Sequence, residues 1–181
     1  MLILASASPR RHELLLAAGI PHVVRPAAIP EERQGGESPA SFVKRLAEEK
    51  ARSIPRQTGD VVLGADTAVC LEEAIFGKPS DLEDASRMLR ALSGRTHSVY
   101  TGICLLSDRR LIVDSALTYV TFAPLSDNEI KDYTRSGEPL DKAGAYAVQG
   151  LASKFVLSIE GCYQNVVGLP VSLVYHHLKS L

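Results

Sequence analysis

The chain has 181 residues, of which 45% are hydrophobic and 23% are charged. Both fractions are typical of a water-soluble globular protein, and a chain of this length can bury roughly 70% of its unfolded surface without disulfides or structural metals. The net charge of −1 excludes a global electrostatic attraction to nucleic acids or membranes, so an anion would have to bind at a local cluster of cations.

Cysteine usage and the lack of long apolar runs restrict the class of protein further. Cys70, Cys104 and Cys162 are far apart and have no CxxC spacing, which argues against a disulfide framework or a zinc site and suits a reducing cytoplasm. The first residues lack the basic segment and apolar run of a signal peptide, and no run approaches the roughly 18 apolar residues of a membrane helix. We therefore expect a cytoplasmic protein that does not bind membranes.

The first predicted strand leads into a loop that suits an anion. Residues 2–5 form a short apolar run, typical of a buried strand, and Ser8 with the proline after it predicts a helix that ends at Gly19. The free N–H groups and dipole of a helix N-terminus favour an anion, and the guanidinium groups of Arg10 and Arg11 match phosphate oxygens. We interpret this loop as a candidate phosphate site, with a solvated helix start as the alternative.

A long loop separates the second predicted strand from the second predicted helix. Residues 23–24 are two valines that predict a short strand. Residues 28–37 predict a loop that contains Glu31. Ser38 and the proline after it repeat the capping signal, and the apolar spacing that follows predicts a helix as far as Ser53.

A carboxylate follows the next apolar strand. Residues 61–65 are apolar and end at Asp66 and Thr67, and residues 68–71 either extend this strand or begin its hairpin partner. Ligands of α/β sheets bind beyond the carboxyl ends of strands. A carboxylate at that position can bind Mg²⁺ or accept a proton from water, whereas capping the next turn is the commoner role of a single aspartate.

Two turn signals come next. Lys78 lies between a glycine and a proline in a rigid loop that could present its ammonium to an anion, and an ordinary surface lysine is the alternative. The pattern from Ser80 to Glu83 predicts a capping box that opens a helix ending at Gly94. The histidines have no metal-binding spacing, so we expect His97 to be structural.

The second half of the chain completes a mixed pattern. Its predicted elements are strands at residues 98–107, 111–122 and 155–159, a helix opened by a capping box at residues 126–129 and ending at Gly137, a tight turn at residues 165–170, and a closing helix at residues 171–181. Strands and helices in this order predict an α/β fold with a mixed, partly antiparallel sheet flanked by helices. We see no repeat or linker, so we expect one domain over residues 1–181.

The polar loop at residues 138–150 is rich in charge and glycine, which is unusual for a simple connection. Lys142 adds a cation, and Gln149 carries the paired donor and acceptor that can recognise the edge of a base. A solvated loop is the alternative. Basic residues are not interleaved with aromatic ones, so nucleic-acid binding is a weak hypothesis.

Taken together, these stretches resemble the Maf family of nucleotide pyrophosphatases, also called septum-formation inhibitor proteins. The matching pieces, in order, are residues 6–11, Leu14, Leu15, Glu31, residues 46–51, 64–67, 77–79 and 92–94, His97, and residues 138–150 and 167–170. One piece alone would be a weak signal. The ordered set covers nearly the whole chain and is specific.

The resemblance implies hydrolysis of a nucleoside triphosphate to a monophosphate and diphosphate with a divalent metal, Mg²⁺ or Mn²⁺. It also implies an elongated fold like that of inosine-triphosphate pyrophosphatases, and a homodimer. By matching position, Asp66 resembles the proton acceptor of the family, and Arg11, Thr67 and Gln149 resemble its substrate-selecting residues. The stretch from residue 141 to 150 is similar to the branch that acts on dTTP and UTP rather than on 7-methyl-GTP.

The mechanism that we expect is attack of water on the α-phosphorus, with Asp66, Glu31 and the metal orienting and deprotonating that water. Candidates to neutralise the phosphates are Arg10, Arg11, Lys50, Lys78 and Lys142, with Ser8 cradling phosphate oxygens. Thr67 and Gln149 would contact the base.

One local departure concerns the metal. Pro30 and Glu31 stand where the family commonly has a pair of acids, and Glu32 is the alternative partner for Asp66. Rival functions are a pyrophosphatase for another modified nucleotide and a non-enzymatic regulator of septum formation.

Overall fold

The computed structural model describes residues 1–181, which divide into two compact units. The first unit comprises Met1–Thr67, Tyr100–Ala116 and Gly168–Leu181. The second unit comprises Ala68–Val99 and Leu117–Val167. None of the helices has the length and apolar character that a membrane span requires.

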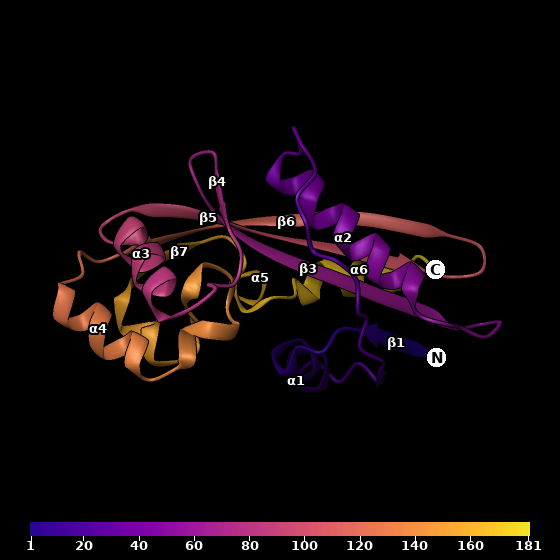
Figure 1. Ribbon diagram of the computed structural model, residues 1–181. Helices are drawn as coiled ribbons and strands as arrows, with labels where there is room; N and C mark the ends of the chain where they lie inside the picture. Colours follow the sequence, from indigo (N-terminus) through magenta and orange to yellow (C-terminus); the bar gives the residue numbers. More distant parts are fainter. The chain divides into compact units, whose positions relative to one another are not determined.

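The strands form one mixed sheet in the order β2-β1-β3-β5-β6-β7, with β4 paired to β3. Figure 1 labels every strand except β2. The strands are β1 (Leu2–Ala5), β2 (Val23–Val24), β3 (Val61–Leu71), β4 (Ala74–Phe76), β5 (Thr96–Leu106), β6 (Leu111–Phe122) and β7 (Val156–Glu160). Strand β1 is parallel to both β2 and β3, whereas β4 is antiparallel to β3 and β7 is antiparallel to β6. The predicted mixed, partly antiparallel sheet is therefore confirmed.

The helices agree with most of the expected positions. They are α1 (Pro9–Ala17), α2 (Pro39–Ser53), α3 (Leu82–Leu92), α4 (Asp127–Arg135), α5 (Tyr163–Val167) and α6 (Val171–Leu178), with 3-10 turns η1 (Glu138–Asp141), η2 (Ala143–Ala145) and η3 (Leu151–Phe155). The Ser38 cap of α2 and the capping box that opens α4 are both confirmed.

The predicted capping box at the start of α3 is wrong by one residue. Asp81, not Ser80, is the N-cap, and its carboxylate accepts a hydrogen bond from the Asp84 N–H at 2.8 Å. The Asp84 carboxylate accepts in return from the Ser80 N–H at 3.1 Å. An ionised carboxylate is a stronger acceptor than a hydroxyl, so the aspartate takes the cap.

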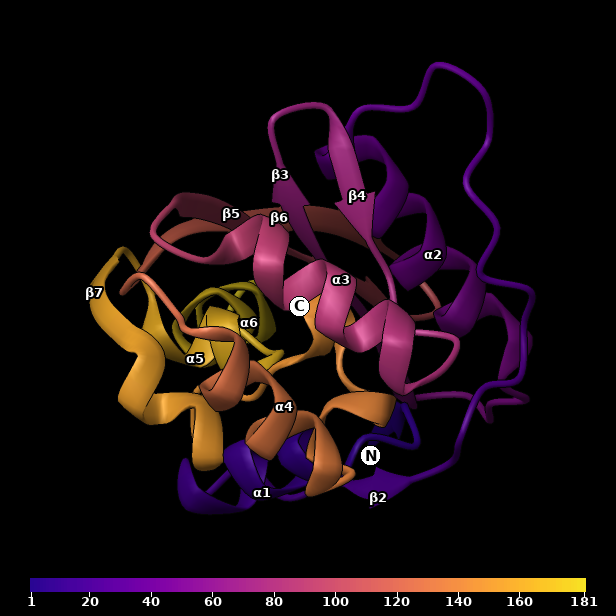
Figure 2. The same cartoon turned by 60° about the vertical axis from the view of Figure 1, so that its left-hand side comes forward.

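Two short elements were missed by the sequence pattern. Residues 68–71 extend β3, and β4 is its hairpin partner at Ala74–Phe76, where the sequence predicted no strand (Figure 2). Helix α5 is a single short helix that overlaps the predicted turn at residues 165–170. Both are too short to show a hydrophobic period of their own.

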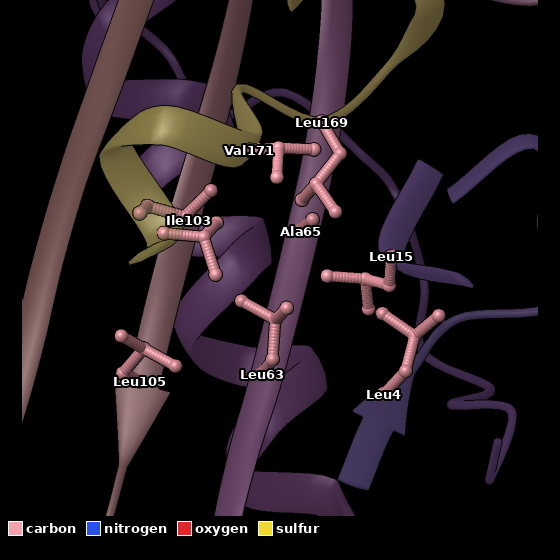
Figure 3. Packing of buried hydrophobic residues seen from close by; sticks show 9 residues of the cluster. Leu4, Leu15, Leu63, Ala65, Ile103, Leu105, Leu169 and Val171 are labelled. Carbon is pink, nitrogen blue, oxygen red and sulfur yellow. The ribbon is translucent and has the colours of Figure 1, made fainter. Parts of the chain in front are cut away.

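The core of the first unit has two layers, one on each face of its strands. Alternate residues of a strand point to opposite faces. One face packs against α1 and α6, through the buried residues Leu4, Leu15, Leu63, Ala65, Ile103, Leu105, Leu169, Val171 and Val174 (Figure 3). The other face packs against α2, through Ile3, Ala5, Ala47, Ala51, Ile54, Val62 and Cys104.

Two glycines allow α2 to lie directly on the sheet. A Cβ at Gly64 in β3 would lie 2.0 Å from the Ala47 carbonyl oxygen, and a Cβ at Gly102 in β5 would lie 2.3 Å from the Val43 carbonyl oxygen. Both obstacles are helix backbone, so a side chain at either position would force the helix away from the sheet.

We predict that Gly102→Ala lowers the free energy of unfolding by about 1–3 kcal/mol, because the added methyl meets backbone that cannot move aside. Gly35→Ala is the matched control, since a Cβ there would meet nothing within 4 Å. Urea-induced unfolding measures both. Equal stability of the two variants would contradict the close approach of α2.

The second unit has an aromatic core that contains His97. The imidazole is 2% exposed and its Nε2 lies 2.8 Å from the Tyr146 hydroxyl oxygen. Phe122 packs edge-on against both rings. Burial lowers the pKa of His97 to about 4. His97 is structural, as expected.

The buried neutral histidine predicts a specific loss of stability in acid. In the unfolded chain His97 takes up a proton near its ordinary pKa of about 6.5, whereas in the folded chain it does so near pH 4. The contribution of the neutral imidazole is therefore complete above about pH 6.5 and falls by about 3 kcal/mol as the pH drops to 4. His97→Gln should flatten this part of the profile of unfolding free energy against pH. An unchanged profile would show that another group causes the loss.

Candidate active site

Arg11 joins three segments of the first unit at the start of α1. Its guanidinium is buried and donates from Nε to the Gly168 carbonyl at 2.8 Å, from Nη1 to the Ser6 hydroxyl at 3.0 Å and from Nη2 to the Thr67 hydroxyl at 3.0 Å. The Thr67 hydroxyl also lies 2.9 Å from that of Thr101. Burial lowers the pKa of Arg11, but a guanidinium stays charged in proteins. Arg11 is thus a fixed, buried cation rather than a surface arginine.

The loop before α1 is shaped by the same contacts. The Ser8 N–H donates to the Ser6 hydroxyl at 3.2 Å. Ser8 occupies the predicted N-cap position, but its side chain makes no capping hydrogen bond, so that part of the prediction is wrong. Ser8 and Arg10 are both partly exposed at this helix start. The arrangement suits the binding of an anion, which a helix N-terminus favours.

A buried ion pair lies on the other face of β3. The Lys50 ammonium on α2 lies 2.6 Å from Asp66 Oδ1 and 2.6 Å from Glu31 Oε1. Lys50 and Asp66 are 6% and 7% exposed, whereas the Glu31 side chain is nearly half exposed. Asp66 lies within β3 and not at its end, and its carboxylate pairs with Lys50, so the capping alternative is wrong.

The environment of Asp66 suits a proton acceptor. Burial raises the pKa of its carboxyl, although the nearby charges of Lys50 and Arg11 oppose the shift. A carboxylate is a more effective base when its pKa lies closer to neutral pH. Charged groups are seldom buried unless they have a function or a partner, and Asp66 has a partner within hydrogen-bond distance.

The donor set fits a metal that binds together with a phosphate ligand. No group of three or more His, Cys, Asp or Glu side chains lies close enough to hold an ion by itself. Mg²⁺ is commonly bound by one or two carboxylates, with waters and substrate phosphates as its other ligands. Asp66 and Glu31 both reach the same ammonium and provide such a pair. Glu32, the alternative partner, is exposed, and its backbone carbonyl accepts a hydrogen bond from Arg45.

In the second unit, the loops that carry Lys78 and Lys142 lie side by side. The Gly144 N–H donates to the Gly77 carbonyl at 3.0 Å. Gly144 has a φ of +68°, and a Cβ there would lie 2.9 Å from the Val69 side chain, so the position requires glycine. Lys78 is exposed, as its surface alternative predicts, and the two loops are held together by backbone contacts.

Glu138 organises the rest of the long loop. Its carboxylate accepts hydrogen bonds from the Tyr133 hydroxyl at 2.9 Å and the Leu151 N–H at 3.1 Å. It fills the space beside Gly150, where a Cβ would lie 2.3 Å from Glu138 Oε1. The Lys142 ammonium donates to the Glu138 carbonyl at 3.3 Å and to the carboxylate of the neighbouring aspartate. The expected loop is therefore compact, and it presents Gln149 exposed to solvent.

The predicted site residues thus fall into two sets. The first unit contains Ser8, Arg10, Arg11, Glu31, Lys50, Asp66 and Thr67, and the second unit contains Lys78, Lys142 and Gln149. Within the first unit, Asp66 and Thr67 are neighbours on opposite faces of β3, so one contacts Lys50 and the other contacts Arg11. Ser6 and Gly168 lie in the motif stretches 6–11 and 167–170, although the sequence did not predict that they bind Arg11. Thr101 was missed, because a threonine inside a strand carries no separate signal.

We predict that Lys50→Met lowers the free energy of unfolding by about 3 kcal/mol, because it leaves Asp66 charged and buried without its main partner. Adding Asp66→Asn in the same chain should restore part of that loss, since the uncompensated charge is then gone. Urea-induced unfolding of the two single variants and the double variant measures the coupling. Simple addition of the two losses would contradict a buried ion pair.

Comparison with known proteins finds relatives that match the whole length of the chain. The family described as "Maf-like protein" matches residues 1–181. A dTTP/UTP pyrophosphatase of Koribacter versatilis is 50% identical over 179 residues, which cover 98% of this chain and 93% of that protein. A dTTP/UTP pyrophosphatase of Escherichia coli O157:H7 is 49% identical over 181 residues, which cover 99% of this chain and 92% of that protein.

Among solved structures, the Ham1 protein of Staphylococcus aureus aligns with a TM-score of 0.50 and 11% identity, over 99% of this chain and 98% of that one. This likeness concerns the fold alone. The family match over the whole length and the identity of about half the residues establish the relationship that the motifs suggested: the chain belongs to the Maf family.

Proposed function

We propose that this chain hydrolyses dTTP and UTP to the monophosphate and diphosphate. The observation that carries the proposal is the buried Asp66 carboxylate, held by Lys50 beside Glu31, in a chain that shares about half its residues with dTTP/UTP pyrophosphatases. Replacing a buried ion pair by apolar residues is often neutral or stabilising, which favours a functional reason for the pair of Lys50 and Asp66.

In the proposed reaction, Asp66 accepts a proton from the attacking water. The water oxygen forms a bond to the α-phosphorus, the bond from that phosphorus to the bridging oxygen breaks, and diphosphate leaves. Lys50 holds one oxygen of the Asp66 carboxylate at 2.6 Å and so limits its rotation. A carboxylate fixed in this way is oriented before the substrate arrives, which lowers the entropy lost in reaching the transition state.

A divalent cation, Mg²⁺ or Mn²⁺, would be held by Asp66 and Glu31 and would offset the negative charge that develops on the phosphate oxygens. Ser8 and Arg10 at the start of α1 would contact the phosphates, and Lys78 and Lys142 would supply further positive charge. Thr67 and Gln149 would contact the base. Arg11 would select the substrate by fixing the Thr67 hydroxyl, since three of its five N–H donors are engaged with protein oxygens.

A homodimer remains a prediction from the family resemblance, and a cytoplasmic location remains a prediction from the cysteine usage and the first residues of the sequence. Analytical ultracentrifugation at micromolar concentration tests the first of these. A substrate panel of dTTP, UTP, other common triphosphates and modified pyrimidine triphosphates separates the proposed substrates from a modified nucleotide.

We predict that Asp66→Asn lowers the rate of diphosphate release from dTTP and UTP by roughly 10²- to 10⁴-fold, because asparagine cannot accept the proton. Asp114→Asn is the control. That aspartate is also in the first unit and also pairs with a basic side chain, His177, at 2.9 Å. Full activity of the Asp66→Asn protein would refute the mechanism, and so would an equal loss in both variants.

A further inference from the structure

The loop that carries Glu31 has no helix or strand of its own. Residues 25–38 connect β2 to α2, and most of the segment from residue 28 to 38 is exposed. Connections of this length without regular structure are uncommon unless they are functional or disordered. Something must hold this loop if the Glu31 carboxylate is to stay at the Lys50–Asp66 pair.

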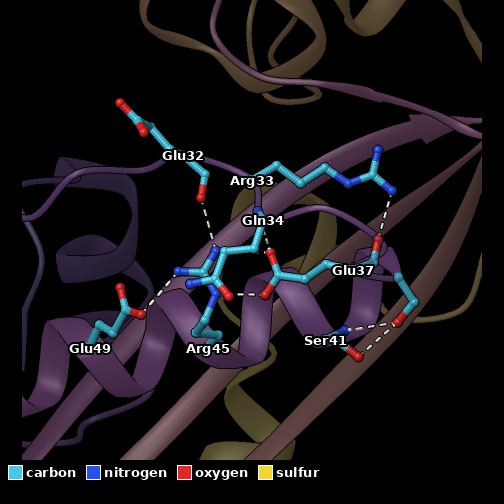
Figure 4. Close-up of polar contacts among 8 residues, drawn as sticks. Glu32, Arg33, Gln34, Glu37, Ser41, Arg45 and Glu49 are labelled. Atoms are coloured by element: carbon cyan, nitrogen blue, oxygen red, sulfur yellow. Dashed lines mark hydrogen bonds and ion pairs between the residues drawn. The ribbon is translucent and has the colours of Figure 1, made fainter.

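Arg45 on α2 makes four hydrogen bonds, three of which hold the loop (Figure 4). It donates from Nε to Glu37 Oε1 at 2.6 Å and from Nη2 to Glu37 Oε2 at 2.9 Å, which is a bidentate pair. Nη2 also donates to the Glu32 carbonyl at 2.9 Å, and Nη1 donates to Glu49 Oε1 at 2.9 Å. The guanidinium thus links α2 to two points of the loop.

Glu37 closes the turn at the end of the loop. Its Oε2 accepts a hydrogen bond from the Gln34 N–H at 2.9 Å, and its carbonyl accepts one from Arg33 Nη2 at 2.6 Å. The hydrogen bonds from Arg45 lower the pKa of Glu37 to about 2. The carboxylate therefore stays ionised at neutral and mildly acidic pH, and the pair with Arg45 persists across that range.

The hydrogen bond from Arg45 to the Glu32 carbonyl also restricts Glu31. These two residues are adjacent, so holding one carbonyl restricts the backbone from which the Glu31 side chain extends. The Glu31 side chain is 46% exposed and pairs with the buried Lys50 ammonium at 2.6 Å, so a backbone held next to it adds to the order of this carboxylate. Arg45, which binds the loop backbone, and Lys50, which binds the Glu31 carboxylate, both lie on α2 and so are held at a fixed separation.

We propose that Arg45, through Glu37 and the Glu32 carbonyl, is a positioning residue that holds Glu31 beside Asp66 and thereby sets the affinity for a divalent cation. This inference rests on the cation site of the proposed function. Arg45 contacts neither carboxylate of that site directly. Residues that orient a metal ligand typically account for about 10- to 100-fold in metal affinity.

The test is Mn²⁺ binding to the whole chain, followed by electron paramagnetic resonance without any substrate. Arg45→Met should raise the Kd for Mn²⁺ by about tenfold. Glu37→Gln, which weakens the same pair from the loop side, should raise it in the same direction. Arg52→Met is the matched control, because Arg52 lies on the same helix and makes only one hydrogen bond, to Glu48 at 2.7 Å. It should leave the Kd unchanged.

A double variant separates positioning from a general loss of structure. If Arg45 acts through Glu31, then Arg45→Met should add nothing to the rise in Kd caused by Glu31→Gln alone. Circular dichroism confirms that each variant is folded. The inference is overturned if Arg45→Met and Glu37→Gln keep the original Kd, if the two losses simply add, or if the unmodified chain binds no Mn²⁺.

Measuring kcat for dTTP distinguishes a failure of this inference from a failure of the proposed function. Saturating Mn²⁺ should return the kcat of Arg45→Met for dTTP to near that of the unmodified chain, because Asp66 and Lys50 are intact. If the unmodified chain binds Mn²⁺ but hydrolyses neither dTTP nor UTP, the proposed function fails, while the comparison of Mn²⁺ affinities still decides the role of Arg45.

Discussion

Helix α2 can lie against the sheet only where Gly64 and Gly102 have no side chains, and the candidate active site depends on that contact. Gly64 and Asp66 are two residues apart on β3 and so point to the same face. On the helix, Ala47 sits over Gly64 and Lys50 follows one turn later. The close backbone contact therefore sets the separation at which the Lys50 ammonium reaches Asp66. Arg45, on the same helix, binds the loop that carries Glu31 through a hydrogen bond to the Glu32 carbonyl.

The site places charge where folding alone would favour apolar residues. Moving Lys50 and Asp66 out of water costs solvation free energy, which their mutual attraction and hydrogen bond only partly offset. The cost falls on the ionised form of Asp66, and this raises the pKa of its carboxyl. The same burial that weakens the fold makes Asp66 a better proton acceptor. Arg11 on the opposite face contributes positive charge but uses its hydrogen bonds to fix Thr67.

Much of this arrangement was predictable from local signals. Serine–proline pairs located α1 and α2, the β-branched run located β3, and the ordered motifs identified the family. The cap at Asp81 was missed because serine and aspartate compete at adjacent positions. The sequence pattern does not show that the Asp66 side chain is buried, so Asp66 taken alone resembled an ordinary helix or turn cap. The sequence left Glu31 and Glu32 as alternatives, because the hydrogen bond from Arg45 to the Glu32 backbone carbonyl spans the loop and no sequence spacing encodes such a contact.

Burial has a larger effect on the pKa of the Asp66 carboxyl than the cations beside it have, and the proposed role of Asp66 depends on this balance. The direct measurement is the pKa of the Asp66 carboxyl, obtained from its ¹³C chemical shift as a function of pH in the folded, metal-free chain, with the signal assigned by comparison with Asp66→Asn. The account predicts a pKa above the ordinary aspartate value of about 3.9. A pKa at or below that value would mean that Lys50 and Arg11 prevail over burial, and it would contradict the role of Asp66 as an elevated-pKa proton acceptor.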